Sequence, residues 1–183
     1  MIQFPKRYAD QVARLRVPSG FLIVAVFAWF SHPTVASLEI GIPISLAGLA
    51  LRAWAAGCLA KNCELATGGP YAYTRNPLYI GTLLVAAGLV VASRSIWLGV
   101  LFVAVFALVY LPVIQLEEQH LRRLFPDYEA YADQVPALCP RFRPALSKNP
   151  NPFRISLYLK NQEYNAGAGF AAGVLLLLWK VVG

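Results

Sequence analysis

Residues 82–116 read TLLVAAGLVVASRSIWLGVLFVAVFALVYLPVIQL and carry one charged side chain, Arg94. An apolar run of this length exceeds the ~20 residues that one crossing of a bilayer needs. It therefore predicts a hairpin of two membrane helices. A polar motif stands at each foot of this hairpin. These are the loop motif GGPYAYTRNPLYIG at residues 68–81 and the acidic motif EEQHL at residues 117–121.

The composition of the whole chain is that of a membrane protein. Hydrophobic residues make up 58% of the 183 residues and charged residues only 14%, unlike a soluble domain. We expect an all-α, polytopic membrane helix bundle with about five transmembrane helices, formed by one integral membrane domain over residues 1–183. The apolar spans cover approximately residues 19–30, 40–60, 77–92, 96–116 and 166–182. The first and third are short and require tilting or local thinning of the bilayer.

Two amphipathic segments border these spans. Apolar side chains at positions 4, 8, 12 and 15 recur at helical spacing within a basic lead. They predict an interfacial helix over residues 1–17 that leads into an uncleaved first span, which we favour over a cleaved signal peptide. After the fourth span, apolar residues between positions 121 and 135 step by three and four. This pattern predicts that the fourth helix continues as a cytosolic amphipathic helix and ends near Pro136.

Basic residues are distributed unequally between the two sides of the predicted bundle. With a cytoplasmic N-terminus, thirteen Lys and Arg residues fall on the cytoplasmic side, whereas Arg94 and Lys180 fall on the other and Arg52 lies inside the second span. This positive-inside bias predicts that both motifs face the cytoplasm. The net charge of +7 follows from this bias, so no nucleic-acid partner is implied. We expect a protein of a bacterial or archaeal inner membrane whose partners are membrane lipids.

The two motifs carry groups that suit one particular kind of ligand. Asn76-Pro77 predicts a helix that begins at Pro77, and the free amides of a helix start suit an anion. Arg75 adds a cation with bidentate geometry. Across the hairpin, Glu117 and Glu118 offer acceptors for ribose hydroxyls or an ammonium group. A zwitterionic, ribose-bearing ligand with a positive centre complements these groups, and S-adenosylmethionine is such a ligand.

These motifs, together with F-P-x-Y-x-x-Y and V-P at residues 125–136, resemble those of the isoprenylcysteine carboxyl methyltransferases and related membrane phospholipid methyltransferases. The resemblance covers residues 51–143 and includes Arg52-Ala53-Trp54. It implies an S-adenosylmethionine-dependent enzyme with a cytosolic cofactor pocket that opens sideways to lipid for the acceptor. Carried over by position, it assigns cofactor binding to Gly69, Tyr71, Tyr73, Asn76, Pro77, Leu78, Glu117 and Glu118. It assigns catalytic roles to Arg75, Tyr79 and Glu118, and substrate binding to Arg52, Trp54 and Arg75.

The chain departs from the family pattern in two places. Asn76 stands where the family usually has histidine, which preserves a cofactor contact but removes any proton-transfer role. Residues 144–183, a polar linker and a C-terminal transmembrane helix, lie outside the resemblance. Gly169 and Gly173 are four residues apart in this helix, a spacing that permits close helix packing. We favour packing within the chain over formation of an oligomer.

The charged residues also have purely structural interpretations. Arg75 can be an interfacial arginine that extends towards the headgroups. Arg122 lies one helical turn beyond the acidic motif and can form an ordinary ion pair with one of its glutamates. Arg52 needs a partner within the bundle, and Glu64 or the acidic motif are the candidates. The three cysteines and two histidines lack a zinc-type spacing, so no metal site is expected.

The residues admit more than one function. A carboxylate acceptor is already ionised and needs no base, and Arg75 suits its orientation. An amine acceptor must lose a proton, for which Glu117 or Glu118 is the candidate base. We favour methylation of the carboxylate of a prenylcysteine-like molecule over that of a phospholipid amine. A sterol-type, NADPH-dependent membrane reductase and a non-catalytic membrane scaffold stay open as alternatives.

Overall fold

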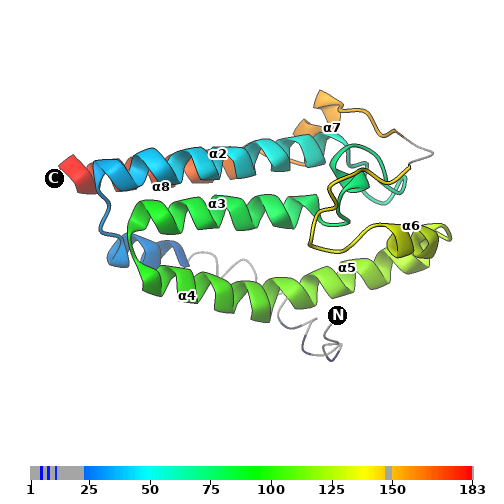
Figure 1. Cartoon of the computed structure of the whole chain (residues 1–183), viewed down its shortest axis with the longest axis horizontal. Helices are drawn as coiled ribbons and strands as arrows, with labels where there is room; N and C mark the ends of the chain where they lie inside the picture. Colours follow the sequence, from blue (N-terminus) through cyan, green and yellow to red (C-terminus); the bar gives the residue numbers. More distant parts are fainter. Residues whose placement is uncertain (1–4, 6–7, 9–10, 12–22, 147–149, 183) are drawn as a thin grey trace.

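The computed structural model describes residues 5, 8, 11, 23–146 and 150–182, and every regular element within them is helical. Figure 1 shows the long helices running side by side. Three segments are long and apolar enough to cross a membrane: α2 (Val35–Gly57), the continuous stretch Ile96–Leu124, and α8 (Tyr164–Val182). A shorter apolar helix, α3 (Pro77–Ser93), runs between them. The predicted all-α membrane bundle is confirmed. The count of five spans stays a prediction, because part of the first span lies outside the described residues.

The N-terminal predictions are described only in part. Residues 23–30 form a helix within the predicted first span. The predicted interfacial helix over residues 1–17 lies outside the described residues, apart from three isolated positions. After residue 30 the chain turns, and α2 begins at Val35, five residues before the predicted start of the second span. Thr34 causes this early start, because its side chain accepts from the Ser37 amide (3.3 Å) while the Ser37 hydroxyl accepts from the Thr34 amide (2.9 Å), a capping box.

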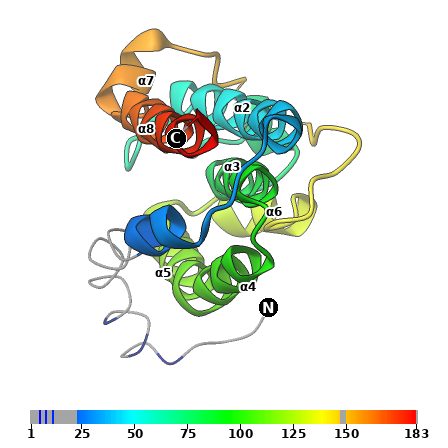
Figure 2. The same cartoon turned by 90° about the vertical axis from the view of Figure 1, so that its left-hand side faces the viewer.

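The centre of the bundle is the close contact between α2 and α3 (Figures 1 and 2). Small residues line it, so the two backbones approach closely, as is usual in membranes. A Cβ atom added to Gly48 would lie 2.7 Å from the carbonyl oxygen of Gly81. The Ser45 hydroxyl donates across the contact to the carbonyl oxygen of Val85 at 2.9 Å. This packing fixes the end of α2 against the start of α3, where the loop motif lies.

The second arm of the hairpin is one long helical stretch with an irregular turn. It consists of α4 (Ile96–Val105), the π-helical turn η2 (Phe106–Tyr110) and α5 (Leu111–Leu124). Pro112 has no amide hydrogen to offer the Leu108 carbonyl, and the Tyr8 hydroxyl donates to that carbonyl at 2.8 Å. Tyr110 packs edge-on against Tyr79 of α3, with 6.0 Å between the ring centroids. The widened turn thus brings an aromatic side chain beside the start of α3.

The prediction that this helix continues to near Pro136 is wrong. Helix α5 ends at Leu124, Phe125 is extended (φ −123°, ψ 113°), and a separate helix α6 covers Tyr128–Gln134. Pro126 explains the break, because a proline disfavours the helical conformation of the residue before it. The break folds α6 back towards the loop motif, as Figure 1 shows.

The C-terminal segment is fastened to the same end of the bundle. It contains α7 (Ile155–Lys160), which leads into α8. The Asn151 side-chain oxygen accepts from the amides of Thr67 and Gly68, both at 3.0 Å. The Asn161 side-chain amide donates to two carbonyl oxygens at the end of α2, each at 2.9 Å. Residues 150–163 therefore hold the loop motif and the end of α2 in place.

Helix α8 packs differently from the prediction. Among the described residues, a Cβ added to Gly169 or Gly173 would meet no atom within 4 Å. The prediction that this glycine face packs closely within the chain is therefore wrong. The helix instead buries Leu177 against Leu38 and Ala92. Figure 2 shows α8 beside α2 at the edge of the bundle.

The described charges keep the asymmetry expected from the sequence. Arg94 and Lys180 lie at the end of the bundle where α3 and α8 end. The other described basic residues outside the helical core lie at the opposite end, where α2 ends and α3 begins (Figure 1). They are Lys61, Arg75, Arg122, Arg123, Arg141, Arg143, Arg154 and Lys160.

Candidate functional site

The loop motif and the acidic motif meet at the foot of the hairpin. Nη2 of Arg75 lies 3.1 Å from Oε1 of Glu118, and the two side chains are only 11% and 9% exposed. The distance between the two atoms makes this contact an ion pair, but the contact does not have the geometry of a hydrogen bond. Two residues that are remote in the sequence thus form a nearly buried pair of opposite charges. This is the juxtaposition on which the sequence-based site depends.

Arg75 also anchors the segment that follows α5. Its Nη1 donates to the carbonyl oxygen of Ala132 in α6 at 3.0 Å, and its backbone amide donates to the carbonyl oxygen of Pro136 at 2.9 Å. The Thr74 hydroxyl and the Asn76 side-chain amide both donate to the carbonyl oxygen of Ala137, at 3.0 and 3.1 Å. The loop motif is therefore ordered by α6 and by the chain that follows it. Asn76 has a structural role in this arrangement, beside any contact with a cofactor.

Several buried polar atoms at this foot have no hydrogen-bond partner among the described residues. They are Nε of Arg75, Oε1 of Glu118 and the hydroxyls of Tyr71 and Tyr128. Buried polar groups in proteins almost always have partners, and leaving one unpaired costs roughly 1–3 kcal/mol. Four such atoms lie on the loop motif, α5 and α6, so a polar ligand bound at this foot would meet groups that can form hydrogen bonds with it.

The tyrosines of the site are held in their neutral form. Burial raises the pKa of Tyr71, with smaller contributions from Tyr131, Cys58 and the carboxylates of Glu117 and Glu163. Burial likewise raises the pKa of Tyr128, and the nearby charge of Glu118 raises it further. Neutral phenols remain hydrogen-bond donors. The Tyr71 hydroxyl, which has no hydrogen-bond partner among the described residues, can therefore donate to an acceptor atom of a ligand, whereas the Tyr128 hydroxyl already lies within hydrogen-bonding reach of Glu118.

The entry to the loop motif requires glycine. Gly69 has a φ of +56°, a left-handed conformation that side chains disfavour. A Cβ at this position would also lie 3.0 Å from Sγ of Cys58 and 3.5 Å from the indole nitrogen of Trp54. The short 3₁₀-helix η1 (Gly69–Ala72) follows and buries Tyr71. Trp54, a predicted substrate-binding residue, thus lies beside the first turn of the loop and is partly exposed.

Arg52 forms a second ion pair close to this foot. Its guanidinium makes a bidentate contact with Glu163, with Nε–Oε1 at 2.5 Å and Nη2–Oε2 at 3.0 Å. Its Nη1 donates to the hydroxyl of Thr82 (2.5 Å) and to the carbonyl oxygen of Leu78 (3.4 Å). The expectation that Glu64 or the acidic motif holds Arg52 is wrong. Glu64 instead pairs with Arg154 at 2.9 Å.

The remaining predicted residues occupy different environments. Glu118 is buried, whereas Glu117, its neighbour on the helix, is exposed. Arg122 pairs with Glu129 of α6, so the alternative that Arg122 neutralises the acidic motif is wrong. Tyr73 lies in the loop, where its carbonyl accepts from the Arg141 amide at 2.9 Å. Pro77 is fully buried at the first position of α3, and Tyr79, two residues further on, contacts Tyr110.

Four residues of this foot were not assigned to the site from the sequence. Tyr128 and Tyr131 belong to the quoted F-P-x-Y-x-x-Y motif, but their spacing also fits an ordinary apolar face. Tyr131 donates its hydroxyl to the carbonyl oxygen of Tyr71 at 2.8 Å. Thr82 and Glu163 carried no signal, because one is a lone threonine in an apolar helix and the other lies beyond the motifs. Among the described residues, no group of three His, Cys, Asp or Glu side chains is placed to hold a metal ion.

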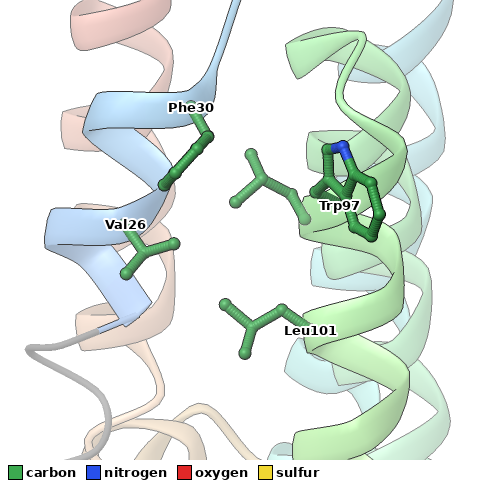
Figure 3. Close-up of a pocket in the computed structure, with 5 residues that line it drawn as sticks. Val26, Phe30, Trp97 and Leu101 are labelled. Carbon is green, nitrogen blue, oxygen red and sulfur yellow. The ribbon is translucent and has the colours of Figure 1, made fainter.

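An apolar cavity lies at the other end of the bundle. It has a volume of about 350 Å³ and is lined by Val26, Phe30, Trp97, Leu98 and Leu101. Figure 3 shows it between the helix of residues 23–30 and the first turns of α4. At 1.5 Å per residue, Leu101 lies about 25 Å along the helix from Glu118. The cavity therefore does not belong to the candidate site.

Two curated proteins resemble this chain over somewhat more than half of its length. The chain is 35% identical over 115 residues to the nickel-cobalt-cadmium resistance protein NccN of Alcaligenes xylosoxydans xylosoxydans. The aligned residues make up 62% of this chain and 53% of that protein. It is 34% identical over 115 residues to the cobalt-zinc-cadmium resistance protein CzcN of Cupriavidus metallidurans. Here the aligned residues make up 62% of this chain and 52% of that protein. The chain thus spans about half the length of these curated relatives. No solved structure matches it significantly.

The model of one protein family matches the central part of the chain. The family is described as phospholipid methyltransferase, and the match covers residues 40–128. This segment contains most of α2, the loop motif, α3 and the complete stretch from α4 to α5, so it includes both Arg75 and Glu118. The resemblance inferred from the two motifs is confirmed, because residues 40–128 match the phospholipid methyltransferase family.

Proposed function

We propose that this chain is an S-adenosylmethionine-dependent methyltransferase that modifies a lipophilic acceptor taken from the bilayer. One observation carries the proposal. Four buried polar atoms that lack a hydrogen-bond partner among the described residues lie on the loop motif, α5 and α6, and two of them belong to the Arg75–Glu118 ion pair itself, where the two motifs of a methyltransferase family meet. A scaffold protein would gain nothing from leaving these atoms unpaired, since each one costs stability.

The chemistry of these atoms fits the cofactor. Oε1 of Glu118 is an acceptor suited to ribose hydroxyls or an ammonium group, and Nε of Arg75 is a donor suited to a carboxylate. The hydroxyl of Tyr71, on the loop motif, is a further donor. S-adenosylmethionine carries all of these partner groups and, when bound, supplies a methyl group on a sulfonium leaving group. We therefore assign cofactor binding to this cluster.

The residues of the site have three tasks in such a reaction. The Arg75–Glu118 pair and its contacts with α6 hold the loop motif in one arrangement, which favours an aligned nucleophile. The burial of Tyr71 and Tyr128 keeps water away from the reacting groups. Their raised pKa values keep both hydroxyls protonated at neutral pH, so they act as donors and not as bases.

The acceptor is the finer part of the proposal. The carboxylate of a prenylcysteine-like molecule, which we favour from the sequence, would have to draw Arg75 or Arg52 away from an internal carboxylate. Both arginines are already paired, with Glu118 and Glu163 respectively. An amine requires no such exchange, because it needs no arginine as its partner. The structure therefore supports a phospholipid amine as the first candidate and the prenylcysteine carboxylate as the second.

The orientation in the membrane belongs to the same proposal. Basic residues concentrate at the end of the bundle that carries the site, which favours a cytoplasmic site under the positive-inside rule. A cytoplasmic site also has access to S-adenosylmethionine. We therefore place the site on the cytoplasmic face of a bacterial inner membrane.

A labelling experiment tests the proposal. The purified chain is incubated in nanodiscs with a radiolabelled methyl donor and total bacterial lipid, and the labelled species is identified by chromatography. We expect label in a lipid with wild-type protein and with Glu129→Gln, which removes an exposed ion pair at the same foot. We expect none with Glu118→Gln. Label that persists in Glu118→Gln, or is absent from wild-type protein with every lipid fraction, would reject the proposed site or the proposed activity.

A further inference from the structure

Arg52 carries a charge at an unusual place in the bundle. It lies five residues before α2 ends at Gly57, which is about 8 Å along the helix axis. Charged side chains inside a membrane span are rare, and they pair with one another or mark a functional pathway. Arg52 does pair, but its partner comes from residues 144–183, outside the segment that matches the family. The C-terminal extension thus adds a residue to the core of this chain.

The pair is held tightly and lies next to the start of α3. Both nitrogens of the bidentate contact reach Glu163, while the third nitrogen of the guanidinium binds Leu78 and Thr82 of α3. The side chains of Arg52 and Glu163 are 23% and 10% exposed. Gly81 leaves the room for this arrangement, since an added Cβ would collide with Cγ of Arg52. Each of the three nitrogens of the guanidinium therefore donates to a group of the protein itself.

The pair also lies within electrostatic reach of the candidate site. Burial is the main cause of the raised pKa of Tyr71, followed by the neighbouring Tyr131, Cys58 and Glu117. The carboxylate of Glu163 makes a smaller contribution in the same direction. The hydroxyl of Tyr71 is one of the four unpartnered atoms of that site. A change of charge at Glu163 is therefore felt at the Tyr71 hydroxyl of the proposed site.

We propose that Glu163 is a specificity-determining positioning residue, which cancels the charge of Arg52 beside the first turns of α3 and thereby makes the site discriminate against an anionic acceptor group. The inference rests on the proposed function. Without Glu163, Arg52 would present an uncompensated guanidinium at membrane depth, where a lipid carboxylate is a strong partner. With Glu163, that cation is already neutralised. An acceptor with a neutral or amine nucleophile then meets no competing charge.

A second ion pair provides a matched control. Arg154 and Glu64 also tie the C-terminal segment to the core, at 2.9 Å, but their side chains are 48% and 41% exposed. If Glu163 served only to fasten the extension, removal of either carboxylate would have the same kind of effect. A role in acceptor selection is specific to Glu163.

The test measures the choice between two acceptors. Full-length protein in nanodiscs receives equal amounts of phosphatidylethanolamine and N-acetyl-farnesylcysteine, and the ratio of the two methylated products is determined. The amount of each acceptor retained by the protein without methyl donor is measured in parallel. The variants are Glu163→Gln, Arg52→Gln, the double variant of these two, and Glu64→Gln as control.

The expected shifts have opposite signs. Glu163→Gln raises the share of the carboxylate acceptor by about tenfold, the size typical of a lost charge interaction, and Arg52→Gln lowers it. The double variant returns towards the wild-type ratio, and Glu64→Gln keeps that ratio. An unchanged ratio in Glu163→Gln, or an equal shift in Glu64→Gln, would overturn the proposal. Should Glu163→Gln not fold, the shift in Arg52→Gln decides, and no shift there overturns the proposal equally.

The two measurements separate this inference from the proposed function. Retention of the acceptors reports on charge selection even when no methyl group is transferred. Wild-type protein that transfers no methyl group, but shows the expected shifts in retention, would contradict only the methyltransferase activity. Methyl transfer with the same ratio in all variants would contradict only the role of Glu163.

Discussion

Replacing Glu118 with glutamine should destabilise the protein far more than the loss of an ordinary ion pair. The Arg75–Glu118 pair is about nine-tenths buried on both sides. Removing one partner of a buried pair typically costs about 3–5 kcal/mol, because the other charge is left uncompensated. The Arg122–Glu129 pair at the same foot is 42% and 62% exposed. Exposed pairs contribute about 0.2–1 kcal/mol, since solvent screens them.

These values translate into melting temperatures that can be measured. For a chain of this size, 1 kcal/mol shifts Tm by about 2–4 °C. Glu118→Gln should therefore lower Tm by about 6–20 °C, and Glu129→Gln by at most about 4 °C. Circular dichroism of the protein in detergent micelles records both transitions. The double variant Arg75→Gln/Glu118→Gln should lose less than the sum of the single variants, because no unpaired charge remains. Equal Tm values for Glu118→Gln and Glu129→Gln would refute the buried pair.

Three further predictions follow from the packing and the pKa shifts. Gly48→Ala places a Cβ 2.7 Å from a backbone oxygen of α3 and should lower the free energy of unfolding by about 1–3 kcal/mol. Gly169→Ala, which meets no described atom within 4 Å, should leave Tm unchanged. Equal effects of the two substitutions would contradict the α2–α3 contact. Asn151→Ala removes the acceptor of two loop amides and should lower the free energy of unfolding by about 1–3 kcal/mol. We expect a lower Tm and faster proteolysis of the loop motif. Unchanged proteolysis of the loop motif would contradict this anchor. The pKa values of Tyr71 and Tyr128 are raised in the folded state, so the unfolded state releases their protons first as the pH rises. The stability from these two groups is therefore fully present below the unfolded pKa of about 10 and is lost above it. Denaturant titrations between pH 8 and 11 should show this decline in wild-type protein and a smaller decline in the double variant Tyr71→Phe/Tyr128→Phe; equal declines in the two proteins would contradict it.

The sequence allowed the hairpin and the meeting of its two feet to be predicted for a clear physical reason. Lipid forces an apolar segment into helices of a certain length, so two polar motifs that flank two such helices must return to the same side. Arg75 and Glu118 meet for this reason. The family resemblance followed from the residue types in the same two motifs.

Other features depended on contacts that a pattern does not contain. The periodicity of residues 121–135 continues through Pro126, so the break between α5 and α6 was hidden beneath a regular pattern. The choice of Glu163 as the partner of Arg52 depends on how the C-terminal segment packs, and a charge beyond a polar linker gives no sign of its target. The glycines of α8 have a spacing that fits a helix contact, but spacing does not tell whether a neighbour is present. In each case local pattern and tertiary packing are independent.

Calorimetric titration with S-adenosylhomocysteine tests the central claim most directly. The claim is that the Arg75–Glu118 foot binds a sulfonium nucleotide. We predict saturable binding to wild-type protein and to Glu129→Gln, affinity reduced at least about tenfold in Glu118→Gln through loss of a charged hydrogen bond, and no binding of NADPH. Binding of NADPH in place of S-adenosylhomocysteine, or equal affinity for S-adenosylhomocysteine in wild-type protein and Glu118→Gln, would contradict the account.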